Sequence, residues 1–244
     1  MKQVLLKIVH NIKIADDVYE MKLFGDVKAI TSPGQFINIK IDGLYLRRPI
    51  SVCFVDDNSV VIVYKVVGKG TKALSLMQSS ELDCLLGLGN GYNLTLSGNN
   101  PLLLGGGVGV PPLYLLAKKL IDDNKNVTVV LGFNSKKDVF YEENFKKLGA
   151  KVIVTTADGS YGIKGFVTDA VKELDYSYFY TCGPEPMLKA VYKTLKTSGQ
   201  FSFEERMGCG FGACMGCSCK TITGYKRICK EGPVLNKEEI LWED

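Results

Sequence analysis

The sequence predicts a multidomain α+β protein with an N-terminal antiparallel β-barrel, a central α/β doubly wound unit and a small cysteine-rich C-terminal unit. Short apolar runs separated by turn residues fill the first part of the 244-residue chain. Buried strands alternate with helical segments in the middle, and five of the eight cysteines crowd into the last fifth. We therefore expect three units, at residues 1–97, 98–202 and 203–244.

The barrel is predicted from apolar runs of strand length. They lie at residues 4–9, 36–41, 50–55, 60–67 and 94–96. Strands this short, separated by turn residues, are typical of an antiparallel barrel or sandwich.

The central unit shows strands and helices in alternation. Strands are expected at residues 102–104, 127–132, 151–155 and 178–181, and helices at 113–121, 142–148, 167–174 and 186–197. This alternation predicts a doubly wound parallel sheet of the kind that binds nucleotides.

Composition excludes several classes of protein. The net charge is +4, from 30 basic and 26 acidic residues that are interspersed, which argues against nucleic-acid binding. No uncharged apolar run reaches the roughly 18 residues of a membrane span. Lys7 and His10 interrupt the apolar N-terminus too early for a signal peptide, so we expect a cytoplasmic protein.

His10 is the single histidine, and it follows a strand-like start. A Rieske centre and an H-E-x-x-H zinc site each need two histidines. A Ser-His-Asp triad has no plausible histidine here either. We predict no catalytic side chain and expect His10 at the surface or at a strand edge.

The clustered cysteines predict a [2Fe–2S] centre. Cys209, Cys214 and Cys217 follow the plant-type ferredoxin spacing C-x4-C-x2-C, and Cys229 comes after eleven further residues. Glycines between them allow the loop to fold tightly around a cluster. Cys219 lies outside the ligand spacing and is predicted to be a spare thiol. A zinc site and merely buried thiols are the alternatives, but a zinc ribbon needs a second C-x2-C pair about 15–20 residues away, and none follows.

A glycine turn predicts a nicotinamide-nucleotide site. An apolar strand runs into Gly105, Gly106, Gly107 and Gly109, and Val110 and Pro111 begin a helix. Glycines let the backbone approach a pyrophosphate, and the helix start offers free amides. A second segment, with Cys182, Gly183, Pro184 and Met187, ends a later strand at the carboxyl edge of the sheet. A glycine turn used only for packing is the alternative.

Both sites together require a flavin. A nicotinamide exchanges two electrons as hydride, whereas a [2Fe–2S] cluster ordinarily takes one, and a flavin usually connects the two. The candidate residues are in 47–52, where an arginine can pair with a pyrophosphate and a serine with the flavin ring, and in 65–71, a glycine turn with a lysine and a threonine for phosphate. An exposed strand end with basic residues is the alternative.

These motifs, in this order and over essentially the whole chain, resemble the ferredoxin-reductase-like flavoproteins and, within them, the electron-transfer subunits of type B dihydroorotate dehydrogenase. Leu88-Gly-Asn-Gly-Tyr92 and Cys229-Lys-Glu-Gly-Pro-Val234 resemble segments of those subunits. The second segment selects Cys229 over Cys219 as fourth ligand. Leu86-Gly87 replaces a more usual Gly-Pro, and the insertion before the fourth ligand is shorter than expected.

The resemblance implies a set of cofactor contacts. For FAD these are Arg48 at the pyrophosphate, Ser51 near the isoalloxazine, and Pro49, Ile50, Lys65, Val66, Val67, Gly70 and Thr71. For NAD they are Gly105, Gly106, Gly107, Gly109, Val110, Pro111, Cys182, Gly183, Pro184 and Met187, and for the cluster Cys209, Cys214, Cys217 and Cys229.

The resemblance also implies a partner, an FMN-containing catalytic subunit that oxidises dihydroorotate in pyrimidine synthesis, with two copies of each chain in a heterotetramer. Electrons would pass from FMN through [2Fe–2S] and FAD to NAD+. Two other functions stay open: a subunit of another NAD(P)H-linked complex, of bifurcating or hydrogenase type, and a redox-sensing module without turnover. The choice between NAD and NADP depends on residues 133–138, which are both basic and acidic.

Overall fold

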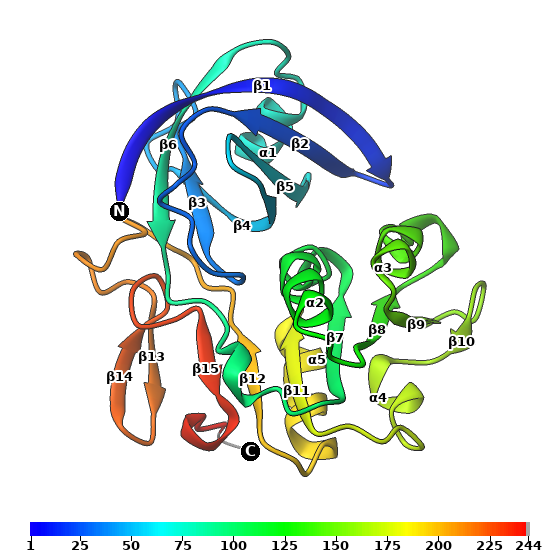
Figure 1. Ribbon diagram of the computed structural model, residues 1–244. Helices are drawn as coiled ribbons and strands as arrows, with labels where there is room; N and C mark the ends of the chain where they lie inside the picture. Colours follow the sequence, from blue (N-terminus) through cyan, green and yellow to red (C-terminus); the bar gives the residue numbers. More distant parts are fainter. Residues whose placement is uncertain (243–244) are drawn as a thin grey trace.

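Six antiparallel strands close into a barrel in the N-terminal part of the chain (Figure 1). The structure, a computed structural model, describes residues 1–242. The strands run in the order β1-β2-β5-β4-β3-β6. Their bounds are β1 Lys2–Ala15, β2 Val18–Phe24, β3 Phe36–Ile39, β4 Arg48–Val55, β5 Ser59–Lys65 and β6 Glu81–Leu88, and the short helix α1 (Lys69–Ser75) lies between β5 and β6.

The two faces of β3 have different neighbours. Ile37 and Ile39 are fully buried in the barrel interior. Because side chains alternate along a strand, Phe36 and Asn38 point out of the barrel, and Phe36 belongs to the buried cluster that includes Cys217 and Cys229.

Next to the barrel lies a seven-stranded sheet in the order β10-β9-β8-β7-β11-β12-β15. All neighbours are parallel except β12 and β15. The strands are β7 Pro101–Gly106, β8 Thr128–Phe133, β9 Lys151–Thr156, β10 Ile163–Lys164, β11 Tyr178–Cys182, β12 Gly199–Ser202 and β15 Val234–Asn236. The sheet confirms the predicted α/β class.

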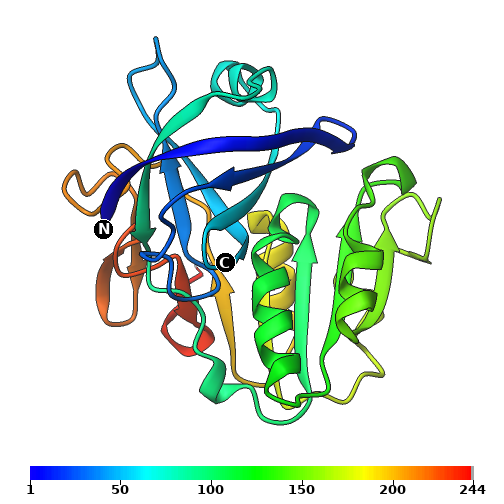
Figure 2. The same cartoon turned by 45° about the horizontal axis from the view of Figure 1, so that its top comes forward.

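Helices cover both faces of this sheet. Helices α2 (Pro112–Asp122) and α3 (Glu142–Leu148) lie side by side on one face (Figure 2), and α4 (Val167–Ala170) and α5 (Glu185–Thr194) pack on the other. Short 3₁₀ turns occupy Gly107–Gly109, Lys136–Asp138 and Lys237–Glu239. No helix of residues 1–242 has the length and apolarity needed to cross a membrane.

Three sequence-based expectations need correction. Leu94–Leu96 is a 3₁₀ turn and not a strand, because the Asn93 side chain accepts a hydrogen bond from Thr95 N at 3.0 Å and starts the turn. The helix expected at 167–174 ends at Ala170, in a segment rich in β-branched residues. Helix α5 ends at Thr194 because Leu195 takes an extended conformation and is buried.

The cysteine-rich segment is joined to both larger units. It forms a hairpin, β13 (Ser218–Thr221) and β14 (Gly224–Arg227), and then adds β15 to the sheet antiparallel to β12. Asn90, in the connection between the barrel and the sheet, donates to Val234 O at 2.7 Å and accepts from Val234 N at 3.1 Å.

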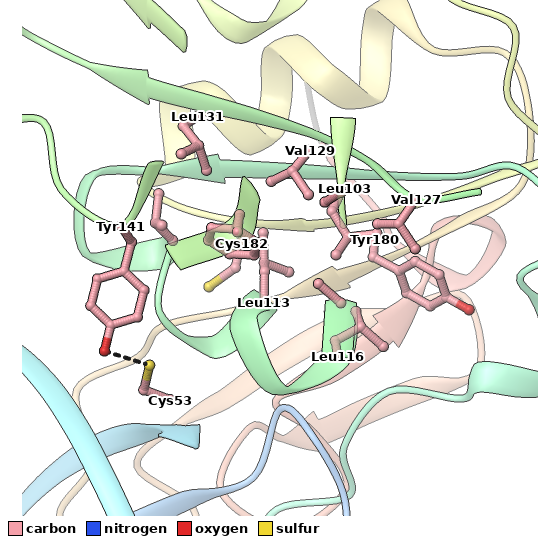
Figure 3. Close-up of a cluster of buried hydrophobic side chains, with 14 of the residues drawn as sticks. Cys53, Leu103, Leu113, Leu116, Val127, Val129, Leu131, Tyr141, Tyr180 and Cys182 are labelled. Carbon is pink, nitrogen blue, oxygen red and sulfur yellow. Dashed lines mark hydrogen bonds between the residues drawn. The ribbon is translucent and has the colours of Figure 1, made fainter. Parts of the chain in front are cut away.

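The main core crosses from the barrel to the sheet. Val18, Cys53 and Val63 of the barrel belong to the same buried cluster as Leu113 and Leu116 of α2 (Figure 3). The two units therefore pack through an apolar interface that fixes their relative position.

Candidate cofactor sites

The cluster loop, residues 208–217, wraps around its own sulfur atoms. Cys209 Sγ accepts hydrogen bonds from the backbone of Ala213 at 3.2 Å and of Cys214 at 3.4 Å, and Cys209 N donates to Cys214 Sγ at 3.5 Å. Cys217 Sγ accepts from Cys229 N at 3.4 Å. The four predicted ligands thus form two neighbouring pairs, an arrangement that suits a two-iron cluster in which each iron takes two cysteines.

The electrostatic environment of these thiols differs. Burial opposes ionisation of Cys209, but amides in loop 211–214 outweigh it and lower its pKa to about 6. Burial, followed by contact with Cys217, raises the pKa of Cys229 to about 12. Bound iron would supply the positive charge that a buried thiolate needs. Within residues 1–242, no three His, Cys, Asp or Glu side chains gather around a single-ion site.

An ion pair holds the cluster loop in place. Arg227 Nη1 donates to Gly212 O at 2.6 Å, and Arg227 Nε donates to Glu231 Oε2 at 2.9 Å. Hydrogen bonding to Arg227 lowers the pKa of Glu231 to about 2, so the pair stays charged at neutral pH. Arg227 therefore ties the loop to the segment that carries Cys229.

The cluster loop also contacts the barrel, at β3. Asn38 Nδ2 donates to Cys209 O at 3.2 Å, and a side chain at Gly210 would collide with Asn38. Pro49 and Ser51 pair across the strands with Asn38 and Phe36, so they share this outward face. Asn38 Oδ1 is buried and accepts no hydrogen bond from residues 1–242. This unpaired acceptor fits a face that receives a polar cofactor or solvent.

The structure brings together two predicted FAD residues that are far apart in sequence. The Arg48 guanidinium lies against Gly70, in the space that a side chain at Gly70 would fill. Thr71 behaves differently, because its Oγ1 accepts from Val67 N at 2.9 Å and from Gly68 N at 3.2 Å. The Thr71 hydroxyl therefore starts α1 and is already engaged within its own turn.

A cleft of about 460 Å³ runs along the carboxyl ends of β7, β8 and β9. Ligands bind at this edge in open α/β sheets. Five of the predicted site residues line it: Lys65 from the barrel, and Gly106, Gly107, Pro184 and Met187 from the sheet unit. Its volume and its position between the two units fit a nicotinamide nucleotide that meets a flavin held on the barrel.

Other predicted NAD residues lie beneath the cleft and are needed for packing. A side chain at Gly109 would overlap the Cys182 carbonyl, and one at Gly105 would press on Val110. Cys182 is fully buried, and burial keeps its pKa well above the usual range, so it is an inert thiol. The glycines let the turn approach β11 closely.

Sequence reasoning missed several residues that line the cleft. Phe140, Thr155, Phe166 and Thr168 all contribute to it, whereas Asp138, which also lines it, belongs to the predicted segment 133–138. Only Thr155 carried a signal, because it lies at the carboxyl end of a predicted strand. The others come from turns and helix starts whose approach depends on tertiary packing.

Two family profiles match the chain. An oxidoreductase NAD-binding domain matches residues 103–193, and the iron-sulfur cluster binding domain of dihydroorotate dehydrogenase B matches residues 204–241. Two curated relatives are named dihydroorotate dehydrogenase B (NAD(+)), electron transfer subunit. The one from Bacillus pumilus is 46% identical and the one from Shouchella clausii 45% identical, each covering 98% of both chains.

A solved structure, described as the NADH-dependent reduced ferredoxin-NADP oxidoreductase of flavin-based electron bifurcation, superposes with a TM-score of 0.88. It is 32% identical and covers 98% of this chain and 90% of its own. The barrel, the sheet and the cysteine loop are those of a ferredoxin-reductase-like oxidoreductase with an iron–sulfur segment. With relatives this similar over nearly its full length, the chain belongs to the family of dihydroorotate dehydrogenase B (NAD(+)) electron transfer subunits.

Proposed function

We propose that this chain passes electrons between a dihydroorotate dehydrogenase catalytic subunit and NAD+, through a [2Fe–2S] cluster and FAD, as part of pyrimidine biosynthesis. The contact between the cluster loop and the barrel carries the proposal. Asn38 holds Cys209 on the barrel face that bears Pro49 and Ser51, and Lys65, at the end of the neighbouring strand β5, lines the nicotinamide cleft. A flavin on this face would therefore adjoin both electron partners.

FAD, when bound, exchanges hydride with NAD and single electrons with the cluster. The barrel residues hold it. Arg48 pairs with the pyrophosphate, and Gly70 leaves the space that this arginine occupies. The Ser51 hydroxyl orients the isoalloxazine ring. The remaining contacts are made by Pro49, Ile50, Lys65, Val66, Val67 and the amide of Thr71.

The sheet unit binds and orients NAD. The turn at Gly106 and Gly107 approaches the pyrophosphate, and Pro184 and Met187 line the cleft directly beside Gly106. Gly105, Gly109, Val110, Cys182 and Gly183 keep the turn and β11 in close contact, and Pro111 begins α2. Cys209, Cys214, Cys217 and Cys229 ligate the cluster, and Cys219 does not.

The partner is a catalytic subunit that carries FMN, and the assembly holds two copies of each chain. The compartment is the cytoplasm. None of the eight cysteines forms a disulfide in the described chain, including the buried Cys53 and Cys84, and this supports a reducing compartment.

The test is an anaerobic preparation with and without the catalytic subunit. Flavin absorbance, a rhombic EPR signal after dithionite, and rapid flavin bleaching by NADH are expected of the chain alone. Dihydroorotate should reduce NAD+ only in the mixture. The variant Cys214→Ser should keep bleaching by NADH and lose turnover in the mixture. Dihydroorotate turnover by the single chain would refute the need for a partner, and slow bleaching would favour a redox-sensing module.

A subunit of another NAD(P)H-linked complex is the second candidate. The 32% identical structure, described in terms of flavin-based electron bifurcation, favours it. It predicts that the chain transfers electrons to ferredoxin with a different partner. If the cofactors are present and the mixture with the dihydroorotate dehydrogenase subunit stays inactive, this second function replaces the first.

A further inference from the structure

A chain of hydrogen bonds crosses the apolar interface between the barrel and the sheet unit. Cys53 on β4 donates from Sγ to the Tyr141 hydroxyl at 3.3 Å, and that hydroxyl donates to Glu20 Oε2 on β2 at 2.6 Å. His10 Nε2 on β1 lies 3.1 Å from Glu20 Oε1. Figure 3 shows the Tyr141 side chain reaching from the sheet unit to Cys53 of the barrel. We call these four residues the interdomain hydrogen-bond chain.

Tyr141 is held there at an energetic cost. It is a non-glycine residue with φ of 67°, in the left-handed region, directly before α3. That conformation costs about 1 kcal/mol or more for a residue with a Cβ. Glycine or asparagine would adopt this backbone conformation at a lower cost. The presence of tyrosine therefore indicates that its side chain is needed at this position.

The carboxylate of Glu20 also needs its partners. Its side chain is only 19% exposed, and a carboxylate withdrawn from water is costly unless it is hydrogen-bonded. Burial, then Cys53 and Glu20, raises the pKa of Tyr141 well above its usual range, so the phenol keeps its proton and stays a donor. The interdomain hydrogen-bond chain is thus continuous from the Cys53 thiol through the Tyr141 phenol to the Glu20 carboxylate, and each hydrogen bond strengthens the next.

The interdomain hydrogen-bond chain lies beside the nicotinamide cleft. Phe140, the residue before Tyr141, lines the cleft together with Val18 and Lys65 of the barrel. The rings of Phe140 and Tyr141 are 5.9 Å apart, and those of Phe140 and Phe133 are 5.3 Å apart. A shift of Tyr141 against the barrel would therefore change the width of the cleft.

We infer that Tyr141 is a positioning residue whose bonds to Glu20 and Cys53 set the distance between the flavin face of the barrel and the nicotinamide side of the cleft. The inference rests on the proposed hydride exchange across that cleft. Hydride transfer needs reacting atoms about 3–3.5 Å apart, and a 1 Å misplacement can cost about a hundredfold in rate. Apolar packing alone permits small slides, whereas a directional chain of bonds selects one alignment.

The test is the variant Tyr141→Phe in the holoprotein, which removes only the hydroxyl. The matched control is Tyr161→Phe, because the Tyr161 hydroxyl donates to Glu142 Oε2 at 2.8 Å entirely within the sheet unit. Stopped-flow reduction of FAD by NADH should be at least about tenfold slower in Tyr141→Phe and unchanged in the control. The flavin–nicotinamide charge-transfer absorbance should fall in the same variant, while FAD content and reduction by dithionite stay at the wild-type level.

Conservative replacements complete the test. Cys53→Ser keeps a donor for Tyr141 and should retain the wild-type rate, whereas Cys53→Ala should lower it. If Tyr141→Phe loses FAD, the comparison of Cys53→Ser with Cys53→Ala tests the inference by itself. Equal rates for wild type, Tyr141→Phe and Cys53→Ala would overturn the inference. A wild-type protein that NADH does not reduce would instead overturn the proposed function.

Discussion

Gly70 and Arg48 form a contact that depends on the absence of one side chain. The guanidinium occupies the place of a Gly70 Cβ, and as the flexible end of a long side chain it can be displaced without unfolding the barrel. Gly70→Ala should therefore keep the fold and move Arg48 off the pyrophosphate. Losing one charge-assisted bond costs about 1.5–3 kcal/mol, which weakens FAD binding by roughly ten- to a hundredfold.

The neighbouring Gly68 supplies the control for this FAD titration. A Cβ at Gly68 meets nothing within 4 Å, and its extended backbone suits alanine. Gly68→Ala should bind FAD with wild-type affinity in a fluorescence titration. If Gly70→Ala and Gly68→Ala bind FAD with equal affinity, Arg48 does not contact the pyrophosphate.

Cys219 and Cys229 are both candidates for the fourth ligand when only the first three are fixed by spacing. Cys229 N contacts Cys217 Sγ, whereas Cys219 lies on β13 opposite Lys226. Cys219→Ser should keep full iron content and the rhombic EPR signal, and Cys229→Ser should lose both. If the EPR signal is lost in Cys219→Ser but kept in Cys229→Ser, then Cys219 is the fourth ligand and Cys229 is the spare thiol.

Asp138 bears on the choice between NAD and NADP. Its carboxylate lines the cleft and accepts from Ser135 Oγ at 2.8 Å, while the neighbouring Lys137 pairs with Asp16 at 3.2 Å. An acidic group at this edge suits a ribose hydroxyl and repels a 2′-phosphate. Asp138→Asn should lower the ratio of kcat/KM for NADH over NADPH by at least about tenfold.

Asp158 provides the matched variant for that comparison, since it accepts from Ser160 Oγ at 2.7 Å in the next loop. Asp158→Asn should leave the NADH to NADPH ratio unchanged. If the ratio responds equally in both variants, the preference does not come from Asp138.

The cluster loop is the element that depends most on one ion pair. Arg227 joins Gly212 to Glu231, and no helix or sheet covers the exposed loop residues Phe211 and Met215 within the described chain. Arg227→Met should release iron to a chelator about tenfold faster, since bonds to a charged group are worth roughly 1.5–3 kcal/mol. The exposed Arg206, just before the loop, gives the control Arg206→Met, which should match wild type. Equal release rates would mean that the thiols alone hold the loop.

Among the elements, apolar runs predict some strands and hide others. The strands β2 and β6 escape a search for apolar runs, because Glu20 and Lys22 alternate with core residues in β2, as Glu81 and Asp83 do in β6. The central strands are covered on both faces, so their apolar runs are continuous and their bounds are predicted to within a few residues. Leu94–Leu96 is too short for its pattern to distinguish a strand from a turn.

Some cofactor residues can likewise be predicted from the sequence, and others cannot. The cysteine spacing predicts the loop because its ligands are local in sequence. The contact of Arg48 with Gly70, and that of Tyr141 with Glu20, depend on how distant elements approach, and no local pattern encodes that approach. The unpaired Oδ1 of Asn38 is equally invisible in the sequence, since it results from the packing of the cluster loop on β3.

The molecule as a whole should lose stability in alkali. Burial, followed by the charge of Asp83, raises the pKa of Cys84 from 9.0 to about 12, and burial raises that of Tyr64 from 10.0 to about 12. An unfolded chain releases these protons at lower pH than the folded one, so the stability present below about pH 9 is lost as the pH rises toward about 12. The Cys84 thiol alone accounts for about 2 kcal/mol by about pH 10.5.

Urea unfolding at about pH 8 and about pH 10.5 measures this loss. Cys84→Ala should be less stable than wild type at the lower pH, because it leaves a cavity, and should lose about 2 kcal/mol less on going to the higher one. A fall of the same size in both proteins would show that other groups govern the alkaline transition.

The arrangement of strands also bears on colloidal behaviour. The barrel is closed, so it has no free edge, and the seven-stranded sheet ends in β10 with two residues and β15 with three. The separate hairpin of β13 and β14 has strands of only four residues. Unpaired strand edges are the usual templates for aggregation. Because the unpaired strand edges are so short, the chain is protected against aggregation through its sheets when no partner is bound. An excess of this subunit over the catalytic subunit should therefore stay soluble.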